Sequence, residues 1–499
     1  MSSLHADGFP EREVRARART GTAEVFPAAD GYGDGGELYG AGGSPAAPGG
    51  QLPQGPDALD RLRIVPPVFM PRRLEKLIDL GREPSYEDVE LGGTTGGFTT
   101  PLPLYLSAFG STRAGSGDLA LAATRQAARL GLPMVVGENM VPVHGYRRGE
   151  GDGVRSALLE RIAVYAQTVP DGLGGVVVQQ STEDADSEVW NLLYSDPGTR
   201  ALRDSGRLGF ELKVGQGAKP GLGGMTVVGA EEAGRLAGQF AVRDVFGDPD
   251  RWLRCATPGT FTEEIVRQQL RFMRNNFPLA RTWVKFHPGR DIGRAAATAW
   301  AAGADAVTVD GAEGGTGWAP RVFLDQVGLP LGECLRRIGT PAGDLLATGR
   351  IWEGGRAVRA LALGARAVGL GRAALVAVDE DPRHGLERLV DALALELRLL
   401  VSALGKYRTA DLAPADLWDP TTAPEPAHAP APAPAPGPVP VPAPAPGPVP
   451  VPASAPASAH SPAPVPAPAP GPEPAHAAAG TRTGTGTGTG TALPAGGRS

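Results

Sequence analysis

The chain has 499 residues, a formal net charge of −6 at pH 7 and an isoelectric point near 5.8. Nucleic-acid binding depends on clustered lysine and arginine, so an acidic chain without a basic block does not favour a nucleic-acid partner. No apolar run approaches the about 20 residues of a transmembrane helix, and the first residues lack a secretory hydrophobic segment. We therefore expect a cytoplasmic protein with no membrane partner. Cys255 and Cys334 form no CxxC pair, which predicts neither a disulfide framework nor a metal site.

Composition divides the chain into three parts. Residues 1–56, with stretches such as GYGDGGELYGAGGSPAAPGG, are expected to form a disordered N-terminal extension. Residues 420–499 are rich in Pro and Ala and then in Gly and Thr, and offer few large apolar side chains to offset the entropy of ordering. They are expected to form a disordered, locally polyproline-like tail. Residues 57–419 remain for packed structure, which suits one large α/β domain.

Short runs rich in β-branched residues alternate with segments that carry apolar residues at helical spacing. Eight such runs are found: Leu104–Ser107, Met134–Val136, Gly175–Gln179, Gly209–Val214, Trp283–Phe286, Ala306–Val309, Leu345–Thr348 and Ala367–Leu370. This alternation requires a parallel sheet. Eight β–α units in about 300 residues favour a (β/α)8 TIM barrel, with an open doubly wound sheet as the alternative.

Helix signals lie between the runs. Residues 116–130, SGDLALAATRQAARL, predict a helix capped by Ser116, and Thr262 is expected to cap a helix over residues 262–277. Residues 225–250 are longer than a simple return to the sheet. They indicate an insertion after the fourth strand that contains one helix-like stretch, AEEAGRLAGQFAVRD.

Barrel enzymes build their sites from the loops at the C-terminal ends of the strands. Polar, charged and glycine-rich residues follow the runs of this chain at those places. The stretch GFELKVGQGAKPGLGG contains the fourth run and puts Lys213, Gln216 and Lys219 at the expected mouth of the barrel. Ionic side chains there can meet a ligand.

The seventh and eighth units predict an anion site. Gly349 and Gly371 lie at strand ends, where exposed backbone amides and a helix N-terminus can bind phosphate, and the loops after strands 7 and 8 often do so in barrels. Arg372 can add a charge-assisted contact, with Arg350 as a second candidate. Any single glycine is better explained by a tight turn without a ligand, but the combined pattern favours phosphate.

The fifth and sixth units supply two further candidates. Lys285, in WVKFHPG, is a cation within an apolar strand. It either lies near electron-rich atoms of a ligand, or pairs with Asp310, or points outward. The loop VDGAEGGTGWAP brings Gly315 and Thr316 to a place where backbone can approach a ligand closely, although a glycine-rich turn needs no ligand.

Several of these stretches together resemble the FMN-binding domain of the glutamate synthase family. ELKVGQGAKPG is the longest and most specific, and LSAFGS, the GE of VVGENM, GAEGGTGWAP and LALGARAVGLGRAAL follow the family's order from about Leu104 to Leu375. The resemblance implies an eight-stranded barrel that holds FMN over its C-terminal rim. It also implies the reduction of a 2-imino acid, formed from 2-oxoglutarate and ammonia, to glutamate.

The resemblance assigns roles to individual residues. It places Ser107 and Ala108 against the flavin, and Gln179 and Lys285 at its ring or ribityl region. It gives the phosphate to Gly349, Gly371 and Arg372, and counts Gly315 and Thr316 among the cofactor-binding residues. The catalytic and substrate-binding set that it implies is Glu138, Lys213, Gln216 and Lys219.

Physical chemistry supports this division of roles. A dicarboxylate needs two cations placed apart, which Lys213 and Lys219 provide, and an amide such as Gln216 can donate or accept beside a carbonyl or imine. For Glu138 the alternative to acid/base catalysis is a salt bridge to Arg147 or Arg148. His287, just past the fifth run, is either a proton carrier or a structural histidine.

The chain departs from the family in three respects. No amidotransferase domain is expected; the region after the eighth run, VAVDEDPRHGLERLV, lacks the cysteines of the family's iron–sulfur cluster; and no nicotinamide fingerprint is found. A partner protein that supplies electrons or ammonia is therefore one possibility. Three interpretations stay open: a stand-alone glutamate synthase-like reductase, a flavin oxidase or dehydrogenase of another small amino or hydroxy acid, and a non-catalytic flavin-binding scaffold.

Overall fold

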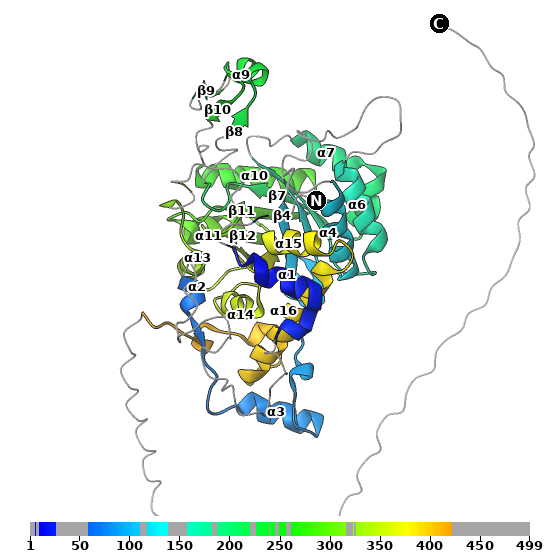
Figure 1. The fold of residues 1–499 in the computed structure, drawn as a ribbon, viewed down its shortest axis with the longest axis vertical. Coiled ribbons are helices and arrows are strands. Elements are labelled where there is room, and N and C mark those ends of the chain that lie inside the picture. The colour runs from blue at the N-terminus through cyan, green and yellow to red at the C-terminus, as the bar shows by residue number, and fades with distance from the viewer. Residues whose placement is uncertain are drawn as a thin grey trace, which may run out of the picture. The chain divides into compact units, whose positions relative to one another are not determined.

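The computed structural model describes residues 5, 9–25, 58–109, 117–137, 157–181, 187–219, 226–238, 240–244, 249–255, 261–315, 323 and 326–421. Its centre is a closed barrel of eight parallel strands in the order β11-β12-β13-β14-β4-β5-β6-β7, surrounded by helices (Figure 1). The predicted (β/α)8 barrel is confirmed. The tail from residue 422 onward lies outside the described residues, so its predicted disorder stays a prediction.

Each of the eight predicted runs is a strand of this barrel. The strands are β4 Leu104–Phe109, β5 Met134–Val136, β6 Val176–Ser181, β7 Leu208–Lys213, β11 Arg281–Phe286, β12 Ala306–Asp310, β13 Asp344–Thr348 and β14 Ala367–Leu370. Almost every residue in them is buried, because the strands have barrel interior on one side and helices on the other. The barrel closes where β14 pairs with β4 and where β7 pairs with β11.

The helices form the outer layer. The longer ones are α4 Gly117–Arg129, α6 Ala157–Thr168, α7 Ser187–Ser195, α10 Glu263–Asn276, α11 Ile292–Ala301, α13 Leu331–Ile338, α14 Gly354–Ala362, α15 Arg372–Glu380 and α16 Gly385–Ala403. The Thr262 side chain accepts a hydrogen bond from the Ile265 amide, so the predicted cap of α10 is confirmed. Ser116 lies outside the described residues.

Side chains inside the barrel change character along the strands. Near the N-terminal ends they are apolar and aromatic, and they form a separate cluster of Phe98, Tyr105, Val135, Val177, Trp283, Ala306, Leu346 and Ala367. Further along, at alternate positions of the same strands, they become polar. The two-residue period of a strand explains this arrangement, since residues i, i+2 and i+4 point to the same side. The polar layers therefore lie towards the C-terminal mouth.

A hairpin of β2 Gly93–Thr95 and β3 Phe98–Thr100 covers the other end of the barrel. Its turn is tied to the barrel by two hydrogen bonds: the Trp283 indole donates to the Gly96 oxygen at 2.9 Å, and the Gly96 amide donates to the Asp344 carboxylate at 2.8 Å. Gly96 has a φ of +55°, and a Cβ there would lie 2.2 Å from the Trp283 ring. Only glycine fits this turn.

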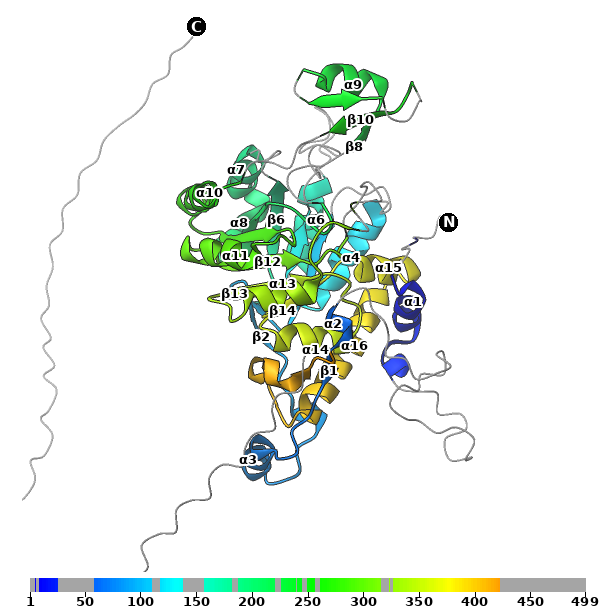
Figure 2. The same ribbon diagram turned by 90° about the vertical axis from the view of Figure 1, so that its left-hand side faces the viewer.

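The N-terminal extension contains more structure than expected. Helix α1, Glu11–Thr20, and the short 3-10 helix η1, Gly21–Val25, pack against α15 and α16 (Figures 1 and 2). Disorder over all of residues 1–56 is therefore a wrong prediction for residues 9–25. Residues 26–57 lie outside the described residues.

The insertion after the fourth strand is not a single helix-like stretch. Helix α9, Ala230–Leu236, is followed by strand β9, Ala241–Arg243, within the segment that was expected to be helical. Together with β8 Thr226–Val228 and β10 Trp252–Cys255, β9 forms an antiparallel sheet of order β8-β10-β9.

Most of the remaining elements lie before β4 or after α16. Helix α2, Ala58–Arg61, leads into β1, Arg63–Ile64, which pairs with β15, Leu417–Trp418. The others are α3 Pro71–Leu80, α8 Arg200–Asp204 and the 3-10 helices η2 Tyr86–Asp88, η3 Pro197–Thr199, η4 Thr409–Asp411 and η5 Pro414–Asp416.

Candidate active site at the barrel mouth

Two lysines lie side by side inside the barrel, near the C-terminal ends of their strands. Lys213 on β7 is in register with Lys285 on β11, and the residues are 6% and 4% exposed. The chain has five lysines, and a third one, Lys219, follows Lys213 closely in the sequence. Burying an ammonium group is costly unless it is compensated, so two adjacent buried lysines indicate a site built for anionic or electron-rich groups.

A buried carboxylate lies one layer below the lysines. Glu211 on β7 accepts a hydrogen bond from the Gln179 amide at 2.5 Å and one from the Thr308 hydroxyl at 2.8 Å. Burial raises the pKa of Glu211; the Lys285 and Lys213 ammonium groups and the two hydrogen bonds oppose that shift only in part. Glu211 thus ties β6, β7 and β12 together below the mouth.

Lys285 also faces a second carboxylate, that of Asp310, which lies two residues beyond its register partner Thr308 on β12. Its ammonium nitrogen lies 3.5 Å from an Asp310 oxygen, and both side chains are about 5% exposed. The Thr348 hydroxyl donates to the other Asp310 oxygen at 2.8 Å. Of the alternatives left open by the sequence, pairing with Asp310 is therefore observed and an outward orientation is not. The pair is at the mouth, where it can also contact a ligand.

The loops after β13 and β14 contain backbone in unusual or open conformations. Gly349 has a φ of +133°, and Arg350 a φ of +56°, which makes Arg350 the one non-glycine residue with positive φ among those described. Gly371 precedes the first residue of α15, and a Cβ added to it would meet no atom within 4 Å. Strained or open backbone of this kind concentrates at functional sites.

One buried arginine holds the β13 loop in place. Arg356 on α14 is fully buried and donates to the Gly349 oxygen from Nε at 3.2 Å and from Nη2 at 3.0 Å. Its guanidinium also forms ion pairs with Glu313, at 2.7 Å, and with Asp60. Because Arg350 pairs with the same Asp60 at 3.0 Å, α2, the β12 loop and the β13 loop are joined through these charges.

Arg372 connects the phosphate-loop candidates to the interior acids. Burial lowers its pKa, Asp310 and Glu313 oppose that change, and Arg350 adds to it. The guanidinium donates a hydrogen bond to the Glu313 backbone oxygen. Arg372, Arg350 and Asp310 therefore interact electrostatically, and Asp310 links them to Lys285.

The other predicted site residues are placed as follows. Ser107 is buried and Ala108 half-buried on β4, and Gln179 is buried on β6. Gln216 and Lys219 face each other across a tight turn, with backbone hydrogen bonds of 3.2 and 2.8 Å between them. Gly315 is exposed in the β12 loop. Glu138, Thr316, Arg147 and Arg148 lie outside the described residues, so their roles stay predictions.

His287, at the end of β11, is mostly buried. Burial lowers its pKa, and Asp291 opposes this shift only in part. Its Nδ1 is buried without a hydrogen-bond partner among the described residues. Its role stays open between a proton carrier and a structural histidine.

Three charged residues that organise the site were not assigned a role from the sequence. Glu211 could have been found from the ELK spacing, since it must point the same way as Lys213. In the sequence, Arg356 is one of several arginines in its region and follows Gly354 and Gly355, which does not indicate its role. Asp60 gave no signal, because its partners Arg350 and Arg356 lie 290 and 296 residues further along the chain.

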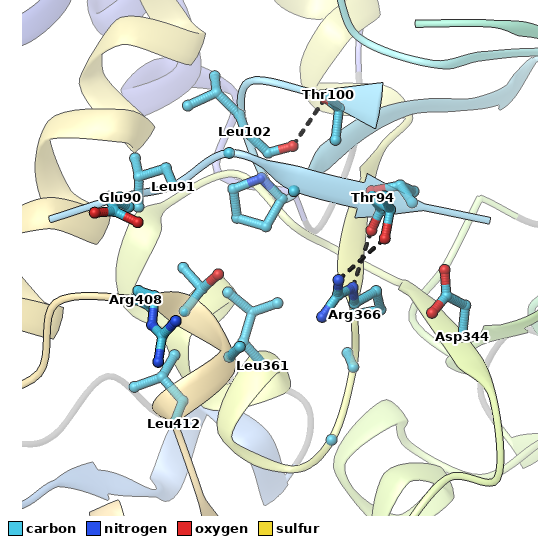
Figure 3. A pocket seen from close by; sticks show the side chains of 18 of the residues that line it. Glu90, Leu91, Thr94, Thr100, Leu102, Asp344, Leu361, Arg366, Arg408 and Leu412 are labelled. Carbon is cyan, nitrogen blue, oxygen red and sulfur yellow. Dashed lines mark hydrogen bonds between the residues drawn. The ribbon is translucent and has the colours of Figure 1, made fainter. Parts of the chain in front are cut away.

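A hollow of about 340 Å³ lies at the opposite end of the barrel (Figure 3). It is bordered by residues that precede β4, β13 and β14, together with the first hairpin strand and the segment around Arg408. Arg366 donates there to Thr94, at 2.9 Å to the backbone oxygen and 3.0 Å to the hydroxyl. None of the predicted active-site residues that the structure describes lines this hollow.

Metal-binding groups and membrane-spanning helices are both absent from the part of the chain that the structure describes. No group of three or more His, Cys, Asp or Glu residues there is arranged to hold a metal ion. None of the helices there is long and apolar enough to cross a bilayer.

Comparison with known proteins identifies a family for the central region. Residues 200–380 match the model of the conserved region in glutamate synthase, which confirms the resemblance seen in the motifs. A glutamate synthase large subunit-like protein of Rhizobium meliloti is 37% identical over 187 residues, covering 35% of this chain and 40% of that protein. An archaeal-type glutamate synthase [NADPH] of Dehalococcoides mccartyi is 32% identical over 195 residues, covering 35% of this chain and 36% of that protein.

The matched region thus spans about two fifths of those relatives. Among solved structures, a soluble mutant of the membrane-associated (S)-mandelate dehydrogenase from Pseudomonas putida aligns with a TM-score of 0.46 at 19% identity. The alignment covers 82% of this chain and 99% of that one.

Proposed function

Because residues 200–380 carry the conserved region of glutamate synthase, we propose that this chain is an FMN-dependent oxidoreductase. Its reaction is the reduction of a 2-imino acid, formed from ammonia and a 2-oxo acid such as 2-oxoglutarate, to the amino acid. The observation that carries this proposal is the in-register pair of buried lysines, Lys213 and Lys285, at the mouth of the barrel.

The residues at the mouth fit FMN. The phosphate is assigned to Gly349, Gly371 and Arg372, where the open backbone at Gly371 and the N-terminus of α15 offer amides to an anion. Arg350 adds a buried Nε that has no hydrogen-bond partner among the described residues. Ser107, Ala108, Gln179 and Lys285 are assigned to the ring and ribityl chain, and Gly315 and Thr316 to the covering loop. When bound, FMN supplies the hydride for the reduction.

Lys285 is assigned to the electron-rich edge of the flavin ring. An ammonium group there stabilises negative charge that develops on the ring during reduction. Asp310, at 3.5 Å, holds the ammonium in place. In this way the ion pair orients a cation without removing it from the mouth.

The substrate is assigned to Lys213, Lys219 and Gln216. The two ammonium groups bind the carboxylates of a 2-oxo dicarboxylic acid, and the Gln216 amide contacts its carbonyl or imine. Glu211, directly below Lys213 on the same face of β7, supplies a nearby carboxyl group fixed by Gln179 and Thr308. Glu138 is retained as the acid/base candidate, and a partner protein as a possible supplier of electrons or ammonia.

An anaerobic titration of the purified protein tests the proposal. The holoprotein should absorb near 450 nm, in the approximate flavin range. After reduction it should be reoxidised by 2-oxoglutarate with ammonium and not by 2-oxoglutarate alone. Lys213→Met should keep the bound flavin and lose this reoxidation, while Lys76→Met, on α3, should behave as the parent.

Other outcomes would contradict the proposal. A colourless protein that takes up no FMN would support a scaffold without flavin. Bleaching by hydroxy or amino acids, with no response to oxo acid and ammonium, would support an oxidase or dehydrogenase. Parent-like turnover of Lys213→Met would remove this lysine from the substrate site.

A further inference from the structure

The N-terminal helix α1 is firmly attached to the outside of the barrel. Val14 and Ala18 are fully buried against the core. Arg15 forms ion pairs with Asp379 at 2.8 Å and Glu380 at 3.2 Å, at the C-terminal end of α15. Acidic side chains at this end would oppose the helix dipole, so the arginine of α1 neutralises an unfavourable charge arrangement.

Phe9, two residues before the start of α1, reaches the other end of α15. Phe9 is 8% exposed, and its ring centre lies 4.8 Å from the guanidinium carbon of Arg372. The guanidinium also donates to the Glu313 backbone oxygen. Arg372 is therefore held by an aromatic face and a carbonyl, and neither contact neutralises its charge.

A second route runs from α1 to the loop after β13. Arg17 donates two hydrogen bonds to the Glu396 carboxylate, at 2.8 and 2.6 Å, and its guanidinium lies 5.1 Å from the Trp352 ring centre. Glu396 in turn accepts the amide of Gly354, the first residue of α14, at 2.6 Å. Trp352 and Gly354 lie in the segment that begins at Gly349, so residues 9–20 contact both regions assigned to phosphate, through Arg17 and through Phe9.

We propose that residues 9–20 form a clasp that positions the two phosphate-binding loops, with Phe9 as the positioning residue for Arg372. This inference rests on the proposed function, because it concerns the same FMN site. Phe9 restricts the long Arg372 side chain before the ligand arrives, so less conformational entropy is lost on binding. The alternative is that helix α1 is only a cover on the outside of the barrel, which adds stability and does not affect ligand binding.

Two flavins distinguish a clasp from a cover. FMN carries the phosphate and riboflavin lacks it, so a residue that acts through Arg372 should affect FMN alone. The experiment titrates the full-length apoprotein with each flavin and follows quenching of flavin fluorescence. It compares the parent, Phe9→Ala, Arg17→Gln and Leu202→Ala; Leu202 is a buried apolar residue of α8, outside residues 9–20, and serves as the control.

We expect Phe9→Ala to raise the Kd for FMN by roughly three- to tenfold, the range of a partly buried cation–π contact, and to leave the Kd for riboflavin unchanged. Arg17→Gln should act in the same direction. Leu202→Ala should lower the melting temperature and leave both affinities as in the parent.

The results separate failure of the clasp from failure of the function. An unchanged FMN affinity in Phe9→Ala, or an equal loss for FMN and riboflavin, would overturn the clasp while the parent still binds FMN. A parent protein that binds neither flavin would overturn the proposed function, and the clasp with it.

Discussion

The Gln179 amide on β6 donates a 2.5 Å hydrogen bond to the Glu211 carboxylate on β7, inside the barrel and below the lysines. This contact fixes a carboxyl group that burial alone would disfavour in its charged form. The Thr308 hydroxyl on β12 holds the other oxygen at 2.8 Å. Glu211 is therefore the acidic centre of a network that spans three strands.

The first prediction concerns the pH dependence of stability. The pKa of Glu211 is raised above its usual 4.5 in the folded protein, so the folded state binds this proton more tightly than the unfolded state. Its contribution to stability is fully present below pH 4.5 and is lost as the pH rises through the raised pKa. Glu211→Gln removes this contribution and keeps a neutral side chain of the same size.

Urea unfolding of parent and variant at several pH values between about 4 and 8 measures the effect. The free energy of unfolding of the parent, relative to Glu211→Gln, should fall as the pH rises. A difference that stays constant, or that grows with pH, would mean that Glu211 is ionised and stabilised in the folded protein.

The second prediction concerns the hairpin that covers the N-terminal end of the barrel. In Gly96→Ala the new Cβ would meet the Trp283 ring at 2.2 Å in a left-handed backbone conformation. We expect a loss of about 2–4 kcal/mol in the free energy of unfolding, from overpacking and backbone strain together.

Gly81→Ala is the matched control for Gly96→Ala. Gly81 has a φ of +65°, but a Cβ there would meet nothing within 4 Å, so only the strain of about 1 kcal/mol remains. Equal losses in the two variants, measured by chemical denaturation, would show that the Trp283 contact has no role in closing the barrel.

The barrel could be predicted from the sequence because its strands are marked locally. Buried parallel strands appear as short apolar runs in the sequence. Each of the eight runs lies inside the observed strand or extends at most one residue beyond it. The residues at the mouth were also predictable, because the loops that follow the C-terminal ends of the strands all lie at one face of a barrel. Lys213 and Lys285 were expected at one rim, and they lie in register.

What could not be predicted depends on contacts between distant residues. The sequence of α1, EREVRARART, has few apolar residues, and its attachment depends on acids of α15 and α16; Arg17 and Glu396 are 379 residues apart. From the sequence alone, a charged segment exposed to solvent cannot be distinguished from one whose charges are paired with distant residues. The same reason hid the pairing of Asp60 with Arg356. In the insertion, β9 was missed because its strand partner β10 lies outside the helix-like segment.

The third prediction concerns Arg356. Replacing it by Met leaves the carboxylates of Glu313 and Asp60 and the Gly349 oxygen without their buried donor. Removal of one member of a buried ion pair costs about 3–5 kcal/mol. The free energy of unfolding should fall by that amount, and FMN affinity should fall because the Gly349 loop loses its anchor.

Arg359→Met, one turn further along α14, is the control for Arg356→Met. Arg359 donates to the Leu62 oxygen at 2.8 Å and lies 3.7 Å from Glu353 at the edge of the core. Its loss should cost about 1 kcal/mol and leave FMN binding unchanged. If Arg356→Met were no more destabilised than Arg359→Met, the proposed anchoring of the phosphate loop would be wrong.

The fourth prediction uses the two members of the Lys285–Asp310 pair, whose charged atoms are 3.5 Å apart. Lys285→Met makes the mouth one unit more negative, and Asp310→Asn makes it one unit more positive. If Lys285 stabilises negative charge on the reduced flavin, the first variant should lower the midpoint potential of bound flavin and the second should raise it. FMN affinity should change in the same order, about tenfold weaker in Lys285→Met for each 1.4 kcal/mol of interaction lost.

Anaerobic redox titration of the two variants and of the double variant measures these shifts. The double variant restores the net charge of the parent, so its potential should lie between those of the single variants. A structural role for the pair would instead shift the two single variants in the same direction, because each leaves one buried charge without its partner. Shifts of opposite sign can arise only if the flavin lies within the field of this pair, which is the arrangement that the barrel mouth predicts.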